Sequence, residues 1–211
     1  MNLLFDHKTG LYHRDGDLRI IHELPSYRLM DPQPTDVILD IGGFVGSVAR
    51  WMRASGARVI SYEPHPESFA LLQMNAPHLS DNNYAALVPD NFEGDTCSLY
   101  VNRGKDNSAH SILSRRGRGE IRVPAVKFSE VVENYQPNKV KMDCEGGEYV
   151  LLANPLASCV RLIAMEFHLT RGEWHARGQD IRDSLLGQGF REVVAPKFFT
   201  KNWNTFGVFT R

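Results

Sequence analysis

The stretch Asp36-Val-Ile-Leu-Asp-Ile-Gly-Gly-Phe-Val-Gly46 decides the fold of this chain. An apolar run ends at Asp40 and breaks into closely spaced glycines, after which apolar residues recur at helical spacing. This order predicts a buried strand, a tight turn and a helix whose free N–H groups face the turn. A second predicted strand, Arg58–Tyr62, leads into Glu63, whose carboxylate is placed to hold a ribose diol. Together these features predict a site for a nucleoside cofactor.

The rest of the chain alternates between strand-like and helix-like segments, which predicts an α/β fold. We expect a Rossmann-like, doubly wound sheet of about seven strands, mostly parallel with an antiparallel last strand and with helices on both faces. The expected strands cover residues 37–41, 58–62, 84–88, 121–126, 139–143, 160–167, 190–194 and 206–210, with weaker candidates at 97–101 and 110–113. The expected helices follow Gly46 and cover residues 66–75, 130–135 (capped by Ser129), 148–153 and 181–186.

The chain is predicted to have two parts. Residues 1–35 are polar and rich in turn-forming residues, so we expect an N-terminal extension that forms a hairpin or cap from Leu11–His13 and residues 18–22. Residues 36–211 then form the main domain. The extension also holds Tyr27, which precedes the first strand of that domain and either packs against it or reaches the cofactor.

The composition of the 211-residue chain excludes several classes of protein. Its formal net charge of −1 gives no overall field that would attract a polyanion. No apolar run is long enough to span a bilayer, and the N-terminus does not resemble a signal peptide. Cys97, Cys144 and Cys159 are scattered, which argues against a disulfide framework or a zinc cluster. We expect a cytoplasmic protein with no membrane partner, and the oligomeric state is left open.

The glycine spacing distinguishes between nucleoside cofactors. The dinucleotide fingerprint needs glycine at the first, third and sixth positions of its loop. Counting from Gly42, the third and sixth positions are not glycine, and no Gly-Lys-Ser/Thr follows, so NAD and a nucleoside triphosphate are disfavoured. Asp40, Gly42 and Gly46 instead fit the acid-x-Gly-x-x-x-Gly motif of methyltransferases that use S-adenosylmethionine. A ligand-free turn and a solvated Glu63 are the plain alternatives, and the two features together favour the cofactor site.

Three segments resemble, in order and spacing, the FkbM family of class I methyltransferases: Asp40-Ile-Gly-Gly-Phe-Val-Gly46, Tyr62-Glu-Pro-His-Pro-Glu67 and Val140-Lys-Met-Asp-Cys-Glu-Gly-Gly-Glu148. The Asp-x-Glu-Gly-x-Glu element of the third segment is the most specific signature of that family. Two positions depart from its usual pattern. The family usually has Ala-Asn where this chain has Gly43-Phe44, and Asn where this chain has His65.

The resemblance implies methyl transfer from S-adenosylmethionine to a hydroxyl group of a sugar, glycan, polyketide or related small molecule. The cofactor-binding residues that we expect are Asp40, Gly42, Gly43, Phe44, Gly46, Glu63, Pro64, Ala86 and Asp143. Two other functions stay open. The acceptor could instead be a nucleotide or nucleic acid bound by the arginine-rich segment 103–122, or the chain could be a binding module that keeps the fold without catalysis.

The reacting group of the acceptor needs a proton acceptor nearby, because an alcohol loses its proton as it is methylated. Asp143 ends the fourth predicted strand at the switch point of the sheet, where it can act as a base, orient the acceptor or bind a metal. Glu145 and His168 are the other candidate catalytic residues. A divalent metal such as Mg or Mn on Asp143, Glu166 and His168 is a further hypothesis. Structural roles are the plain alternative, because acids favour helix N-termini.

Two segments are expected to cover the acceptor. One is the arginine-rich stretch, which is otherwise a solvated loop, and the other covers residues 168–178. Trp174 and His175 in the second segment either stack on the acceptor or pack against the sheet. Cys144 lies between acids, which raise the pKa of a thiol, so we expect no nucleophilic role for it.

Overall fold

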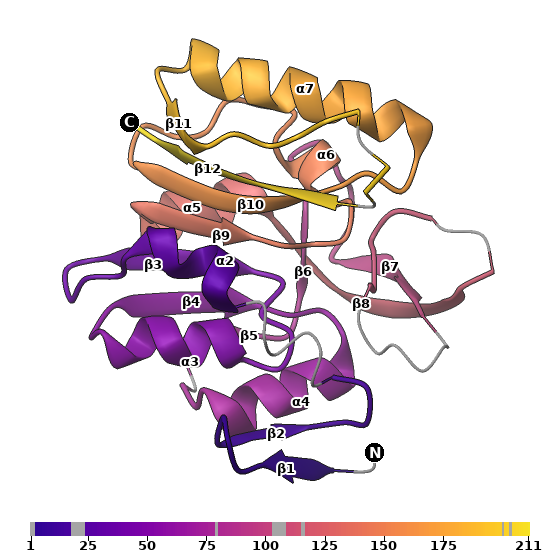
Figure 1. Cartoon of the computed structure of the whole chain (residues 1–211). Coiled ribbons are helices and arrows are strands. Elements are labelled where there is room, and N and C mark those ends of the chain that lie inside the picture. The colour runs from indigo at the N-terminus through magenta and orange to yellow at the C-terminus, as the bar shows by residue number, and fades with distance from the viewer. Residues whose placement is uncertain are drawn as a thin grey trace.

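A computed structural model describes residues 3–17, 24–78, 80–102, 109–114, 117–199, 201–202 and 204–211. Its centre is a seven-stranded sheet with the order β11-β12-β10-β9-β3-β4-β5 (Figure 1). The strands are β3 (Val37–Ile41), β4 (Arg58–Tyr62), β5 (Asn82–Asn83), β9 (Lys139–Met142), β10 (Leu162–His168), β11 (Arg191–Val194) and β12 (Asn204–Thr210). All neighbouring pairs are parallel except those that β12 makes with β10 and β11, which confirms the predicted doubly wound sheet.

Helices cover both faces of this sheet. One face carries α2 (Leu24–Tyr27), the 3-10 turn η1 (Arg28–Met30), α3 (Ser47–Ala54) and α4 (Pro66–Asn75). The other carries α5 (Phe128–Tyr135), α6 (Glu148–Leu151) and α7 (Gly172–Gly187). Within the described ranges, no helix is both long and apolar enough to cross a membrane.

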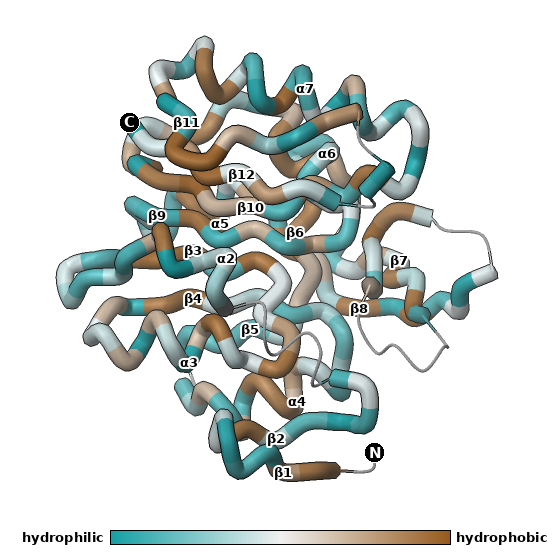
Figure 2. Tube along the Cα trace, in the orientation of Figure 1, coloured by the Kyte–Doolittle hydropathy of each residue, from teal (hydrophilic) through white to brown (hydrophobic). Residues whose placement is uncertain are grey.

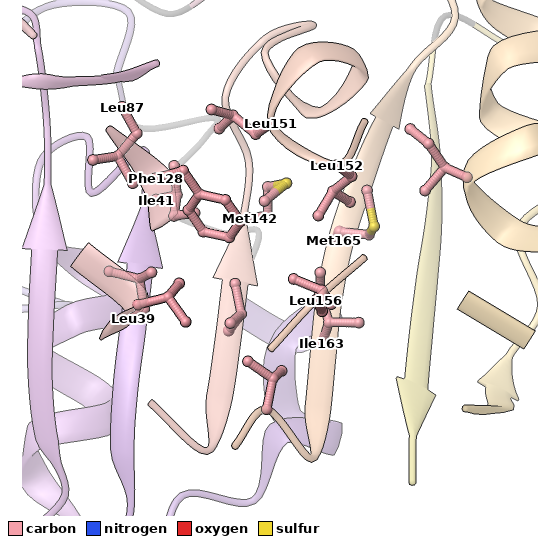
Figure 3. Packing of buried hydrophobic residues seen from close by; sticks show 14 of the residues in the cluster. Leu39, Ile41, Leu87, Phe128, Met142, Leu151, Leu152, Leu156, Ile163 and Met165 are labelled. Atoms are coloured by element: carbon pink, nitrogen blue, oxygen red, sulfur yellow. The ribbon is translucent and has the colours of Figure 1, made fainter. Parts of the chain in front are cut away.

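The central strands carry apolar side chains on both faces because helices bury both faces of the sheet. In β3, Leu39 faces the larger core and Ile38 the smaller one, and both are fully buried. Figure 3 shows the larger core, where side chains of β3, β9 and β10 meet Phe128 of α5 and Leu151 of α6. This packing holds the carboxyl ends of the parallel strands at one edge of the sheet, where ligands bind in such folds.

The predicted strand at residues 84–88 is wrong as a single strand of the main sheet. Asn82–Asn83 pairs with β4, and the chain then leaves the sheet to form β6 (Ala86–Val88). Strand β6 pairs with β8 (Gly119–Lys127), which also pairs with β7 (Thr96–Val101), and these make a separate three-stranded sheet. The apolar side chains of β6 pack there with Cys97, Leu99 and Val123, and this separate core explains the switch.

Two weaker expectations in the same region are also revised. Residues 110–113 form no strand, and only an isolated bridge joins Ser111 to Tyr100. Ser129 lies inside α5, whose N-cap position is occupied by Lys127.

Helix α7 begins at Gly172, well before the predicted start at residue 181. Trp174, Gly178, Ile181 and Leu185 are its buried residues, and they recur at helical spacing. Polar residues between them hid the first two turns from the sequence pattern.

The N-terminal strand pair joins β1 (Leu4–Asp6) to β2 (Leu11–His13), so β2 pairs with a strand that precedes it. The expected partner at residues 18–22 lies outside the described residues. The pair is attached to α4, since the Asn75 amide both accepts from Tyr12 N–H at 2.7 Å and donates to Tyr12 C=O at 2.8 Å. Figure 2 shows that β1 is hydrophobic although it lies at the periphery, and Phe5 there is 43% exposed.

Candidate active site

A cavity of about 550 Å³ lies at the carboxyl edge of the parallel strands. This volume is within the range of about 300–1,000 Å³ that is usual for small-molecule sites. The tips of β3, β4, β9 and β10 contribute to its wall, together with β6 and β7 of the small sheet. Of the residues predicted to bind the cofactor, the following line the cavity: Gly42, Phe44, Glu63, Pro64, Ala86 and Asp143.

The glycines of the first turn allow parts of the protein to approach one another closely. A Cβ on Gly42, where φ is +80°, would lie 1.8 Å from the carbonyl oxygen of Asp143. A Cβ on Gly46, where φ is +85°, would lie 3.0 Å from Leu72 of α4, and one on Gly43 would lie 3.1 Å from the same residue. Gly43 and Gly46 are not among the cavity-lining residues of the described chain. Their role here is to seat the turn against α4.

Asp40 also lies beneath the turn and does not line the cavity formed by the described residues. It is fully buried, accepts a hydrogen bond from Ser61 Oγ at 3.0 Å and pairs with Lys141 Nζ at 3.2 Å. Lys141 in turn donates to the Gly42 carbonyl at 2.5 Å. Burial acts to lower the pKa of Lys141, but the Asp40 and Asp143 carboxylates outweigh it and raise the pKa. Asp40 therefore braces the turn through a buried ion pair.

Glu63 occupies the tip of β4 and faces the cavity. Its Oε2 accepts the Phe44 N–H at 2.8 Å, and its Oε1 accepts the His65 N–H at 2.8 Å. Each oxygen keeps a second lone pair that can accept a further hydrogen bond, which suits a diol. Burial raises the pKa of Glu63 to about 7, although the two backbone donors act to lower it.

Part of the cavity wall is apolar. Ala86 and Leu87 of β6, Leu99 of β7 and Ile112 line it. A purine base needs an apolar surface of this kind to cover its faces. Of these residues only Ala86 was expected, because the small sheet that brings Leu99 and Ile112 to the cavity was not predicted.

Another part of the cavity wall is acidic and centres on His168, which is only 5% exposed. His168 Nε2 lies 3.5 Å from Glu145 Oε2, 3.8 Å from Asp143 Oδ1 and 4.0 Å from Glu166 Oε2. The structure thus brings together the three residues that were expected to take part in catalysis, Asp143, Glu145 and His168. One possible metal-ligand atom from each of these three residues lies within 4.8 Å of the other two. Glu145, at 3.5 Å from His168 Nε2, lies closer than the predicted Glu166, at 4.0 Å.

Glu148 holds His168 in place, a role that the sequence did not single out. This fully buried carboxylate accepts the His168 N–H at 2.8 Å, lies 3.1 Å from His168 Nδ1 and also accepts the Gly146 N–H at 2.9 Å. Burial acts to lower the pKa of His168, but Glu148 and Glu145 outweigh it and raise the pKa well above its usual value. The Asp-x-Glu-Gly-x-Glu element is therefore one unit that surrounds a histidine from the next strand.

Two side chains of the N-terminal extension contact residues that line the cavity. Tyr27 of α2 is buried and donates its hydroxyl to Asp143 Oδ2 at 3.2 Å. The guanidinium carbon of Arg14 lies 5.6 Å from the centre of the Phe44 ring. The hairpin β1–β2 itself packs on α4, and Leu11 of β2 belongs to a small cluster against which Phe44 packs.

The two segments expected to cover the acceptor differ in the structure. Arg103, Lys105, Arg115 and Arg116 lie outside the described residues, while Arg118 lines the cavity. In the second segment, Trp174 is fully buried and stacks on Tyr149 with ring centres 5.0 Å apart, so it packs and does not contact an acceptor. His175 is stacked near Phe199 at 5.9 Å. Burial, with the Glu148 and Asp143 carboxylates, raises the pKa of the Cys144 thiol well above its usual value, so the thiol is no nucleophile.

The strand order and this cavity define a class I methyltransferase, a class that uses S-adenosylmethionine. The chain matches the methyltransferase FkbM domain over residues 36–192. It therefore belongs to the FkbM methyltransferase family, which confirms the resemblance seen in the three sequence segments. No curated protein matches the chain significantly.

The solved structures that are similar to this chain have low sequence identity to it. Precorrin-6Y C5,15-methyltransferase from Geobacter metallireducens is 13% identical, with 100% of this chain and 94% of that chain covered and a TM-score of 0.47. Magnesium protoporphyrin IX methyltransferase from Synechocystis, solved with bound S-adenosylmethionine, is 14% identical, with 92% and 82% covered and a TM-score of 0.46. Fibrillarin from Aeropyrum pernix is 11% identical, with 100% and 82% covered and a TM-score of 0.47. Likeness at this level says nothing about the acceptor.

Proposed function

We propose that this methyltransferase methylates a hydroxyl group on a sugar, glycan or small-molecule natural product. The observation that carries the proposal is the cluster of Asp143, Glu145 and His168, which lines the same cavity as Glu63. A hydroxyl acceptor must give up a proton during the reaction, and carboxylates and imidazole are the side chains that take one.

The described residues fit the cofactor. Glu63 keeps lone pairs for a ribose diol, and the apolar wall of Ala86, Leu87 and Leu99 suits an adenine. Asp143 supplies negative charge for the cationic methionine portion. When bound, S-adenosylmethionine supplies a methyl group that is already activated by a sulfonium.

The remaining work falls to the side chains of the protein. Asp143 and Glu145 orient the acceptor hydroxyl, and the cluster around His168 takes its proton. Glu148 keeps the imidazole in position from behind. Holding the reacting groups in line can contribute roughly 7–11 kcal/mol to the lowering of the barrier, so positioning matters more than any single base.

The test has two stages. Calorimetry with S-adenosylmethionine and S-adenosylhomocysteine measures cofactor binding, and we expect micromolar affinity for both. A panel of sugars, glycans, diols and nucleotides is then screened for release of S-adenosylhomocysteine. No binding of either cofactor form would contradict the proposal, and binding without turnover of any hydroxyl compound would favour a non-catalytic module.

A nucleotide or nucleic-acid acceptor is the second candidate, because Arg118 lines the cavity and can pair with a phosphate. It predicts acceptor binding that weakens steeply with salt. Turnover of neutral sugars that does not change with salt would rule it out.

A further inference from the structure

The acidic end of the cavity has the geometry of a cation site. One atom each from Asp143, Glu145 and His168 lie within 4.8 Å of one another, and all three residues line the cavity. For an octahedral ion with bonds of about 2.1 Å, neighbouring ligand atoms are about 3.0 Å apart and opposite ones about 4.2 Å. The separations of 3.5 Å and 3.8 Å from His168 Nε2 to the two carboxylates fall between these values.

The histidine in this group is held as a metal-binding histidine usually is. Glu148 Oε1 lies 3.1 Å from Nδ1 and also accepts the backbone N–H of His168 at 2.8 Å. The Nε2 atom, which lies near Asp143 and Glu145, is therefore left to face the cavity. A carboxylate on the far nitrogen fixes the ring orientation and makes the other nitrogen a better ligand.

The negative charge of the carboxylates around His168 also favours a bound cation. Four carboxylates, those of Asp143, Glu145, Glu148 and Glu166, lie within 4.0 Å of its ring nitrogens. Lys141 is the buried lysine nearby, but its ammonium pairs with Asp40 and donates to the Gly42 carbonyl. Carboxylate and imidazole ligands with this excess of negative charge suit a hard divalent ion.

We propose that Asp143, Glu145 and His168 bind a divalent cation of the Mg²⁺ or Mn²⁺ type, and that the ion holds an acceptor with two adjacent oxygen atoms. Three protein ligands leave positions of an octahedral ion for water and for two acceptor oxygens. The acceptor class is then a vicinal diol or a hydroxyl beside a carbonyl. This acceptor class rests on the proposed function, whereas the ion binding does not.

The ion has a defined role in the reaction. It lowers the pKa of the bound acceptor hydroxyl, whose proton passes to water. The oxygen then forms a bond to the methyl carbon, and the electron pair of the broken S–C bond stays on sulfur. Asp143 and Glu145 are then ligands of the ion and need not remove the proton themselves.

The experiment measures Mn²⁺ binding to the full chain without cofactor. Electron paramagnetic resonance detects binding as a loss of the signal from free Mn²⁺. We expect one ion per chain with micromolar affinity. Glu145→Gln should weaken binding at least tenfold, and Asp143→Asn should do the same. Glu173→Gln, which removes an exposed glutamate of α7, is the matched control and should bind Mn²⁺ as the unaltered chain does.

The possible outcomes distinguish failure of the proposed ion site from failure of the proposed function. Equal Mn²⁺ affinity in Glu145→Gln, Asp143→Asn and the control, or no binding at all, overturns the ion site. If S-adenosylmethionine still binds in that case, the proposed function stands without a metal. Circular dichroism identifies a variant that fails to fold. With the ion bound, chelation by EDTA should abolish turnover of vicinal diols, and added Mg²⁺ or Mn²⁺ should restore it; turnover that is unchanged by EDTA overturns the proposed role of the ion.

Discussion

The part of the cavity around Glu63, which we propose holds the ribose and call the ribose end, and the part around His168, which we call the acidic end, differ in where their residues come from along the chain. The ribose end is built between residues 42 and 65, and its contacts are hydrogen bonds from backbone N–H groups to one carboxylate. The acidic end joins Tyr27, the segment 143–148 and the tip of β10, and its contacts are mostly between side chains. The ribose end is held by contacts between residues close in sequence, whereas the acidic end depends on how α2 and β10 pack beside the segment that follows β9. The predictions below test this difference, beginning with the largest effect.

Gly42→Ala should damage both ends at once, because a Cβ at this position would lie 1.8 Å from the Asp143 carbonyl oxygen. We expect the free energy of unfolding to fall by more than about 4 kcal/mol, as measured by urea denaturation. Gly94→Ala is the control, since Gly94 also has positive φ (+106°) but nothing lies within 4 Å of an added Cβ. It should cost only about 1–2 kcal/mol. Similar losses in the two variants would show that the close contact at Gly42 is unimportant.

His168→Asn should impair the acidic end and leave the ribose end intact. The Asn side chain can keep a hydrogen bond to Glu148 near the position of Nδ1, but it removes the Nε2 atom that faces Asp143 and Glu145. We expect kcat to fall by about 10²–10⁴ with a cofactor Kd that changes less than about threefold. Calorimetry and a turnover assay measure the two quantities. An equal loss in both would mean that the acidic end also holds the cofactor.

Glu63→Gln should produce the opposite pattern. Its amide cannot accept from both the Phe44 and the His65 N–H groups and still bind a diol with full strength. The loss of a charged acceptor costs about 1.5–3 kcal/mol, so the cofactor Kd should rise about 10- to 100-fold. At saturating cofactor, kcat should stay within a few-fold of the original value. Unchanged affinity would remove Glu63 from the cofactor site.

The affinity for S-adenosylmethionine should depend on pH through Glu63. Burial raises its pKa to about 7 in the cofactor-free protein. Hydroxyl donors from a ribose favour the ionised form, so binding has to remove a proton once the pH falls below this value. Calorimetry should therefore show affinity that is constant above about pH 7 and falls by up to about tenfold per pH unit below it. In Glu63→Gln the same titration should be flat.

Tyr27→Phe should have the smallest effect. It removes only the hydroxyl that donates to Asp143 Oδ2 at 3.2 Å and keeps the buried ring. One such hydrogen bond contributes about 0.5–1.5 kcal/mol, so we expect kcat to change by no more than about tenfold and the cofactor Kd to stay the same. A larger change in Kd than in kcat would place the extension at the cofactor instead of at Asp143.

The ribose end was easier to predict from the sequence than the acidic end, because its contacts join residues that are close along the chain. Glu63 and Gly42 belong to a local pattern of strand, turn, helix and strand, and that pattern was enough to predict two residues that line the cavity. The buried role of Asp40 was hidden, because its partner Lys141 lies on another strand and no spacing rule joins them. The same holds for Glu148, whose contact with His168 depends on how α6 packs against β10.

The small sheet was the least predictable part of the fold. Residues 84–88 are apolar enough to continue the main sheet, and nothing local shows that β6 pairs instead with the distant β8. The long helix α7 was shortened in the prediction because its buried residues include Gly178 among many polar ones. In both cases long-range packing, and not local propensity, determined the element.

The way in which Glu63 is held has a consequence for how this family can vary. Its carboxylate oxygens accept from the main chain at positions 44 and 65, where this protein has Phe and His and related sequences usually have Asn. An amide N–H is the same in every amino acid except proline. Evolution can therefore exchange the side chains at these two positions and reshape the rim of the pocket, while the two backbone hydrogen bonds that orient the Glu63 carboxylate stay unchanged.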